Sequence, residues 1–164
     1  MLSYMRIFAL ARKTLYVTNP YFIPSEGISD ALCQAAVSGT DVRVMVPEKS
    51  DSAIVGAASR FYFAELLRAG VRIFLYKKGF VHAKTVVADS TLSVVGTANM
   101  DIRSFDLNFE IMSVIYGQEF ASQMEEMYLR DLEQCLEYTR EDWESTGVGK
   151  RLLYAVARLI SAFL

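Results

Sequence analysis

Residues 82–110 read HAKTVVADSTLSVVGTANMDIRSFDLNFE, and the pattern of this stretch indicates a β-hairpin. An apolar run follows Lys84, the turn-forming trio Asp89-Ser90-Thr91 comes next, and a second apolar run covers residues 92–95. Because side chains alternate along an extended strand, the spacing of His82 and Lys84 predicts an imidazole and an ammonium on one face. This pair of groups is suited to binding a phosphate.

Short polar residues follow the hairpin. Gly96 permits a close bend, so we expect Thr97 and Asn99 to return to the place where the imidazole and the ammonium point. A further strand is predicted over residues 107–116, and on it Glu110 offers a carboxylate that could hold an imidazole nitrogen. These side chains are therefore expected to converge on one site.

The chain resembles the phospholipase D superfamily through one spaced signature, His82-x-Lys84-x4-Asp89-x6-Gly96-Thr97-x-Asn99. Thr97 stands where many members carry serine. The continuation Asp101-x-Arg103-Ser104 with Asn108-x-Glu110, and the upstream segment of residues 19–24, resemble the second catalytic half of a bacterial cardiolipin synthase. The resemblance covers most of the chain, from about residue 15 to residue 116.

Helical and strand patterns alternate along the chain. Helices are predicted over residues 2–13, 25–38 and 52–67, and a long helix is predicted after Gly117, with apolar residues at helical spacing from Phe120 to Leu136. Further strands are predicted over residues 15–18, 41–46 and 71–76. This alternation predicts an α/β protein with a mixed β-sheet flanked by helices on both faces, as in the phospholipase D fold, plus a C-terminal amphipathic helix.

Length and composition predict one folded domain. The chain has 164 residues, of which 52% are hydrophobic and 22% charged, so it can bury one good-sized core. Its net charge of −2 is not the basic balance of a protein that grips nucleic acid through its phosphates, so a nucleic-acid partner is not favoured. Two cysteines, Cys33 and Cys135, are expected to be reduced and to lie in helices.

The last residues form a separate tail in this interpretation. We assign residues 1–146 to a catalytic domain that carries one copy of the motif, and residues 147–164 to an amphipathic tail after a hinge at Gly147-Val148-Gly149. A basic stripe on this otherwise apolar helix suits an anionic membrane surface. The alternative is a terminal helix docked on its own domain or on a partner. The stripe consists of Lys150, Arg151, Tyr154, Arg158 and Ser161.

The resemblance implies a role for each motif residue in phosphodiester exchange. His82 is the expected nucleophile and forms a phosphohistidine intermediate. Lys84 and Asn99 are expected to hold non-bridging phosphate oxygens, with the Thr97 hydroxyl near the same oxygens. No cluster of residues has the composition of a metal site, so we expect a metal-independent reaction without a cofactor.

Three acidic or basic residues receive supporting roles. Glu110 is expected to accept a hydrogen bond from the far nitrogen of His82 and so to fix its tautomer. Asp89 is counted with the catalytic residues because it belongs to the signature, although its place at a hairpin turn favours an architectural role. Arg103 is expected to hold a neighbouring carboxylate, that of Asp101, Asp106 or Glu110, for structural reasons.

The sequence contains a single histidine, whereas the family brings two motif histidines together at a pseudo-two-fold axis. The partner is therefore expected to be a second copy of the motif, either from a homodimer or from a missing N-terminal half. The expected reaction is phosphatidyl transfer between two phosphatidylglycerol molecules, which gives cardiolipin and glycerol. It would take place at the cytoplasmic face of the bacterial cell membrane, with peripheral association through residues 150–164. A homodimeric phosphodiesterase of the nuclease type and an inactive membrane-binding fragment remain as alternatives.

Overall fold

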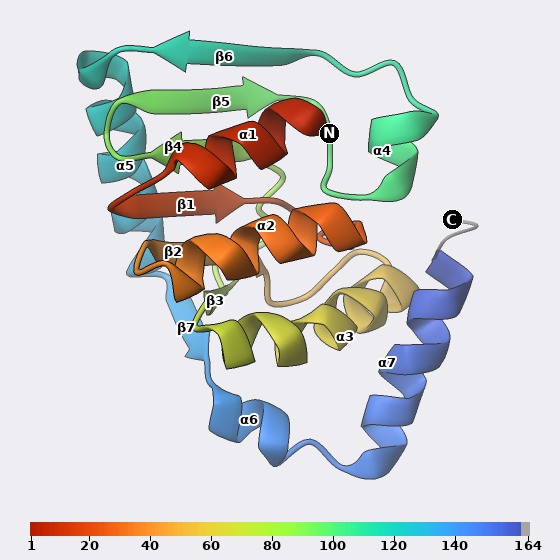
Figure 1. Ribbon diagram of the computed structural model, residues 1–164. Helices are drawn as coiled ribbons and strands as arrows, with labels where there is room; N and C mark the ends of the chain where they lie inside the picture. The colour runs from red at the N-terminus through yellow and green to blue at the C-terminus, as the bar shows by residue number, and fades with distance from the viewer. Residues whose placement is uncertain (162–164) are drawn as a thin grey trace.

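A seven-stranded mixed sheet organises the protein, in the order β6-β5-β4-β1-β2-β3-β7 (Figure 1). The computed structural model describes residues 1–161. β1, β2 and β3 are parallel, whereas β4, β5, β6 and β7 each pair antiparallel with their neighbours. The strands are β1 (Thr14–Thr18), β2 (Asp41–Pro47), β3 (Arg72–Tyr76), β4 (Thr85–Ala88), β5 (Leu92–Gly96), β6 (Met112–Tyr116) and β7 (Cys135–Tyr138).

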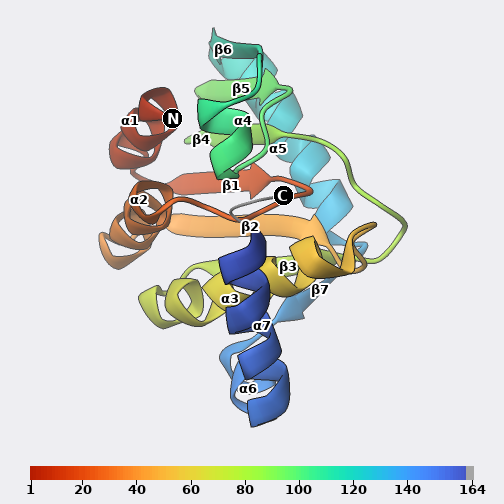
Figure 2. The same cartoon turned by 90° about the vertical axis from the view of Figure 1, so that its right-hand side faces the viewer.

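Helices cover both faces of the sheet, as predicted. α1, α2 and α3 lie on one face and α5 on the other, which is clear when the sheet is seen along its strands (Figure 2). Ser52 begins α3 with a side-chain cap, and Gly70 ends it in the left-handed conformation at φ +92°. The helices are α1 (Leu2–Leu10), α2 (Glu26–Val37), α3 (Ala53–Ala69), α4 (Ile102–Asp106), α5 (Gln118–Leu132), α6 (Arg140–Glu144) and α7 (Val148–Ser161).

The main core lies between the sheet and α1, α2 and α3. Phe8, Phe22 and Phe63 are among its fully buried side chains. A smaller cluster joins α5 to the other face, where the rings of Tyr16 and Tyr128 stack with their centroids 4.8 Å apart. The sheet is therefore packed on both faces without any partner chain.

The predicted hairpin of β4 and β5 is confirmed. The loop covers residues 89–91, and Thr91 N–H donates to the Ala88 carbonyl oxygen at 3.0 Å. The two central residues of this turn, Asp89 and Ser90, have φ angles of +53° and +51°, as the type I′ turn of hairpins requires. The strand predicted over residues 107–116 is wrong in its first half, because the short helix α4 and an irregular segment precede β6.

The long helix predicted after Gly117 extends too far. α5 ends at Leu132, and Cys135 and Leu136 belong to β7, which pairs with the open edge of β3. The prediction of a helical Cys135 is therefore wrong, although both cysteines are free, as expected. An ion pair joins Arg72 of β3 to Glu137 of β7, with an N–O distance of 2.8 Å. The two strands are therefore held together by residues that are distant in sequence.

The C-terminal helix α7 docks on α3, which is the alternative given for the tail. Ala157 is buried against the cluster that contains Ile23 and Ala58. The Arg158 guanidinium lies 5.1 Å from the centre of the Phe61 ring, so this part of the basic stripe packs against α3 while it stays exposed. The expected hinge is helical from Val148, and residues 162–164 of the tail lie outside the described residues.

Apolar side chains of α7 face outward instead. The exposed ones are Val148, Leu152, Leu153, Val156, Leu159 and Ile160. Within residues 1–161, no helix has both the length and the apolar character needed to cross a bilayer.

Candidate active site

Polar residues gather at one edge of the sheet, where β1 and β5 end and the antiparallel strands β4 and β6 begin. The chain reaches this edge five times, through residues 19–24, 48–52, 77–84, 97–101 and 107–111. The edge therefore collects the side chains of the signature from segments that are distant in sequence.

His82 and Lys84 meet here, but not on a strand. β4 begins at Thr85, opposite Thr18, the last residue of β1, so the preceding residues have no neighbour to pair with on that side. The Lys84 ammonium nitrogen lies 3.2 Å from Nε2 and 3.4 Å from Nδ1 of His82, and it donates to the His82 carbonyl oxygen at 2.9 Å. The predicted contact is present, whereas the predicted strand geometry is wrong.

The two side chains differ in their access to solvent. Lys84 is 7% exposed, whereas His82 is exposed at the surface. Burial lowers the pKa of Lys84 below its ordinary value of 10.5, and the nearby carboxylates of Glu110 and Asp101 act in the opposite direction. Because a neutral imidazole has one lone pair, the Lys84 ammonium must give up its contact with that ring nitrogen before the nitrogen can react, and its bond to the His82 carbonyl oxygen keeps it beside the exposed ring.

Aromatic rings flank the imidazole. The centroid of the Phe80 ring lies 5.6 Å from that of His82, and the Tyr21 ring meets it edge-on at 6.1 Å. The Tyr21 hydroxyl donates to Asp51 Oδ2 at 2.5 Å, and this hydrogen bond raises the pKa of Tyr21 to about 12. No spacing in the sequence connects Phe80 or Asp51 to His82, so neither residue was predicted to belong to the site.

Glu110 has partners other than the expected one. Its carboxylate accepts hydrogen bonds from the Thr97 hydroxyl through Oε2 and from Asn108 Nδ2 through Oε1, the latter at 3.3 Å. Among residues 1–161, no hydrogen bond joins His82 to Glu110, so the predicted orienting contact is absent. The reason is that α4 and the irregular segment before β6, rather than a strand, carry Asn108 and Glu110 to the site.

Asn19 fixes the segment that contains Asn99. The buried Asn19 side chain accepts from the backbone N–H of Met100 at 3.1 Å and from that of Tyr21 at 3.3 Å. The backbone bond from Ile23 N–H to the Met100 carbonyl, at 2.9 Å, closes the same contact. The segment of residues 19–24 therefore positions Asn99, a role that the sequence did not reveal.

Asp89 lies at the opposite end of β4 from His82. Its carboxylate accepts three backbone N–H bonds from the connection between α1 and β1, from Arg12 at 2.8 Å, Lys13 at 2.6 Å and Thr14 at 2.9 Å. Burial acts to raise the pKa of Asp89, but these bonds outweigh it and leave the pKa below its ordinary value. These contacts are architectural, and the assignment of Asp89 to the catalytic group does not agree with them.

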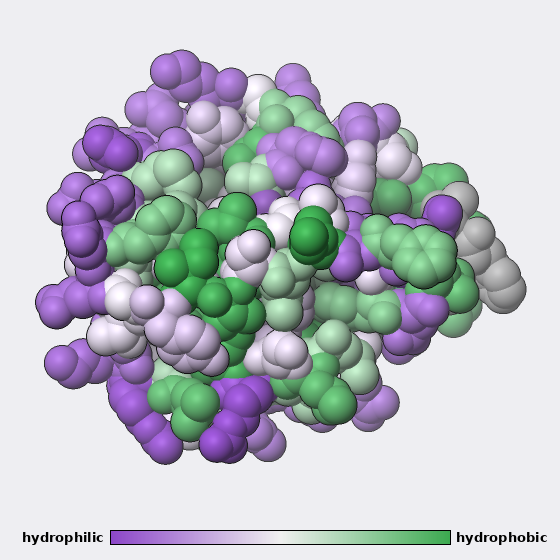
Figure 3. All heavy atoms as spheres, turned by 90° about the horizontal axis from the view of Figure 1, so that it is seen from above, coloured by the Kyte–Doolittle hydropathy of each residue, from purple (hydrophilic) through white to green (hydrophobic). Residues whose placement is uncertain are grey.

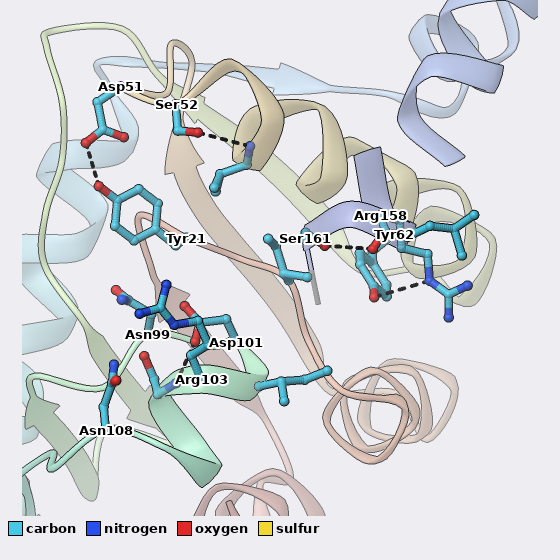
Figure 4. Close-up of a pocket in the computed structure, with 15 residues that line it drawn as sticks. Tyr21, Asp51, Ser52, Tyr62, Asn99, Asp101, Arg103, Asn108, Arg158 and Ser161 are labelled. Atoms are coloured by element: carbon cyan, nitrogen blue, oxygen red, sulfur yellow. Dashed lines mark hydrogen bonds between the residues drawn. The ribbon is translucent and has the colours of Figure 1, made fainter. Parts of the chain in front are cut away.

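A cavity of about 650 Å³ adjoins the signature residues. Figure 4 shows Asn99, Arg103 and Asn108 along one side of it, facing Tyr21 and Asp51. Within the described chain Arg103 makes no ion pair, so its predicted structural pairing with a carboxylate is wrong.

Comparisons with known proteins agree with this architecture. The family model described as cardiolipin synthase, PLD-like domain, matches residues 4–132. Over 162 residues the chain is 45% identical to a cardiolipin synthase of Clostridium perfringens and 42% identical to one of Listeria monocytogenes. Each alignment covers 99% of this chain and 34% of the relative, so the chain spans about a third of the length of these relatives.

Solved structures share the fold at lower identity. Nuc from Salmonella typhimurium, a phospholipase D family member, superposes with a TM-score of 0.75 at 18% identity, covering 84% of this chain and 90% of Nuc. A phosphatidylserine synthase of Haemophilus influenzae superposes with a TM-score of 0.73 at 17% identity, covering 98% of this chain and 44% of the synthase. These likenesses establish the fold.

Proposed function

We propose, since the chain belongs to the PLD-like domain family of cardiolipin synthases, that it supplies one half of the active site of a phosphatidyltransferase. The observation that carries this proposal is the exposed imidazole of His82 with the buried ammonium of Lys84 3.2 Å from its ring. Lys84 can balance charge on a phosphoryl group bound at His82, and Asn99 lies on the same edge to hold an oxygen.

The first step transfers the phosphatidyl group to the enzyme. An unprotonated ring nitrogen of His82 attacks the phosphorus of phosphatidylglycerol, and a nitrogen–phosphorus bond forms as the bond to the glycerol headgroup oxygen breaks. That oxygen takes a proton from a second imidazole and leaves as glycerol.

The second step releases the product. A free hydroxyl of another phosphatidylglycerol attacks the phosphohistidine and passes its proton to the second imidazole, and the nitrogen–phosphorus bond breaks. Cardiolipin leaves, and His82 returns to its unprotonated form. Each imidazole therefore returns to its starting protonation state after one turnover.

The second imidazole must come from another copy of the motif, because the chain contains one histidine. Apolar side chains beside the site support a contact surface for such a copy, since Leu107, Phe109 and Ile111 are 73%, 109% and 71% exposed. These residues precede β6, the edge strand of the sheet. Figure 3 shows the molecule from this side, and hydrophobic surface lies there among polar groups. Peripheral binding to a membrane would involve the exposed apolar side of α7.

Trapping the intermediate tests the proposal. A preparation with both copies of the motif is mixed with phosphatidylglycerol labelled at phosphorus and quenched in alkaline detergent, which preserves phosphohistidine. We expect label on the peptide that contains His82, none in the variant His82→Asn, and cardiolipin on thin-layer plates. Plasmid nicking without cardiolipin would favour the nuclease alternative, and the absence of both label and product would overturn the enzymatic proposal.

A further inference from the structure

The cavity beside Asn99 is bounded by elements outside the signature. Its walls come from residues 19–24, the start of α3, α4 and the last turn of α7 (Figure 4). Asn99 belongs both to the signature and to this cavity, so a ligand bound in the cavity would lie next to a phosphoryl group held by the signature residues. A volume of about 650 Å³ lies within the range of small-molecule sites.

Two polar atoms in the cavity wall are buried and unpartnered within the described chain. They are Asn99 Oδ1 and Ser104 Oγ, and Ser104 as a whole is 4% exposed. Buried polar atoms are almost always paired, because an unpaired one has lost its hydrogen bonds to water without replacing them. Asn99 Oδ1 can only accept a hydrogen bond, so its missing partner is a donor such as a hydroxyl group.

The charged side chains of the cavity fit a phosphate joined to a polyol. Arg103 and Arg158 supply two guanidinium groups, and neither forms an ion pair within residues 1–161. Arg158 Nε donates to the Tyr62 hydroxyl at 3.4 Å, so its two terminal nitrogens are the donors left for a ligand. A guanidinium presents a planar set of donors that matches two phosphate oxygens at once. Two carboxylates also line the cavity: Asp51 already accepts from Tyr21, and Asp101 caps α4 by accepting from the Ser104 N–H at 2.7 Å.

The chemistry of cardiolipin formation requires a second anion site. The product carries two phosphodiesters joined by one glycerol, so at the moment of transfer the enzyme holds one phosphorus at His82 and another one glycerol away. The signature residues account for the first phosphorus. Arg103 lies on the same side of the cavity as Asn99, which places a cation beside the position of the transferred group (Figure 4).

We propose that this cavity binds the headgroup of the acceptor phospholipid, with Arg103 and Arg158 on its phosphodiester and Asn99 and Ser104 on its free glycerol hydroxyls. The inference rests on the proposed phosphatidyl transfer. Ile102 and Leu159 also line the cavity and are 44% and 66% exposed, so the acyl chains have apolar surface where the headgroup enters. α7 thus contributes both a phosphate ligand and an apolar border to the site.

Binding to the chain itself tests this assignment without requiring turnover. Dihexanoyl-phosphatidylglycerol, kept below its micelle concentration, is titrated calorimetrically into the wild type and into the variants Arg103→Gln and Arg158→Gln. We expect affinity to fall about tenfold in each variant, because a charge-assisted contact is replaced by a neutral one. Arg68→Gln is the matched control, since Arg68 is exposed at the other end of α3, and its affinity should stay within about twofold of wild type.

Additional variants and controls distinguish failure of the headgroup site from failure of the proposed function. Arg158→Lys should recover part of the lost affinity, and circular dichroism must show that all variants are folded. Unchanged affinity in both glutamine variants would overturn the acceptor site, as would preferential binding of a short oligothymidylate over the lipid. Arginine-dependent lipid binding without any cardiolipin synthesis by the two-motif preparation would instead refute the proposed function and leave the headgroup site standing.

Discussion

Replacing Asp89 separates an architectural role from a catalytic one. Its carboxylate receives three backbone N–H groups at 2.6–2.9 Å, and a hydrogen bond to a charged group contributes about 1.5–3 kcal/mol. The N–H groups of Arg12 and Lys13 lie at exposed residues, so hydrogen bonds to water can replace most of the stabilisation that their bonds to Asp89 provide. The bond from Thr14 is partly buried and cannot be replaced in this way. We therefore expect Asp89→Ala to lower the free energy of unfolding by about 3 kcal/mol, or the melting temperature by about 6–12 °C.

Asp89→Asn is the more conservative variant. Asparagine tolerates the φ of +53° at this position and keeps one carbonyl oxygen for Lys13 and Thr14. Its free energy of unfolding should fall by about half as much as that of the alanine variant. Asp30→Asn, an exposed site on α2, removes the same charge and should change stability by less than about 0.5 kcal/mol.

The pH dependence gives an independent check. The pKa of Asp89 is lower in the folded protein than its ordinary value of 3.8, so its stabilisation is present above pH 4 and is lost as the pH falls through the folded pKa. The stability difference between wild type and Asp89→Asn, measured by urea unfolding and circular dichroism, should shrink below pH 4. Turnover per folded molecule should be unchanged in the two-motif preparation. A loss of turnover above about 100-fold at unchanged stability would refute the architectural role.

Three further results are expected. Gly96→Ala should lower the free energy of unfolding by about 2–3 kcal/mol, because the added Cβ would lie 2.5 Å from the carbonyl oxygen of Ile111. The urea midpoint should fall accordingly, and an unchanged midpoint would contradict this. Activity should fall as the pH rises through the pKa of Lys84, which burial holds below 10.5. In Lys84→Arg this alkaline limb of the pH–rate profile should move to higher pH. An identical limb in both proteins would show that another group titrates. Ala157→Glu should destabilise the fold by about 2 kcal/mol, because it buries a charge at the contact of α7 with α3. Leu152→Glu, on the exposed side of α7, should not destabilise it. Equal urea midpoints for the two variants would argue against docking of α7.

Local patterns in the sequence predicted the central hairpin correctly. Alternating apolar residues and the Asp89-Ser90 turn act over a few neighbours, and the structure retains both features. The contact of His82 with Lys84 was also predictable, since a single residue separates them and the signature fixes their spacing. The mixed sheet followed from the alternation of helical and strand patterns.

Contacts that depend on irregular segments were not predictable. Glu110 reaches Thr97 because β5 and β6 pair with Gly96 opposite Met112, and no local pattern encodes that register. β7 was missed because Cys135 and Leu136 also fit a helical period, and only the open edge of β3 decides between the two structures. The docking of α7 on α3 stood only as the alternative, since the helix meets α3 through residues distant in sequence.

The two ends of β4 have different roles: the turn end stabilises the fold, and the other end carries the reactive groups. At the turn, Asp89 satisfies three backbone donors and ties α1 to the sheet. At the other end Lys84 is buried beside an exposed imidazole, and Asn99 Oδ1 has no partner within the described chain. Such groups reduce stability unless a ligand binds them, so the hairpin holds His82 in place with contacts made at the far end of the strand. Substitutions at the turn should therefore change unfolding without changing the chemical step, and substitutions of the Lys84 and Asn99 side chains at the edge should do the reverse.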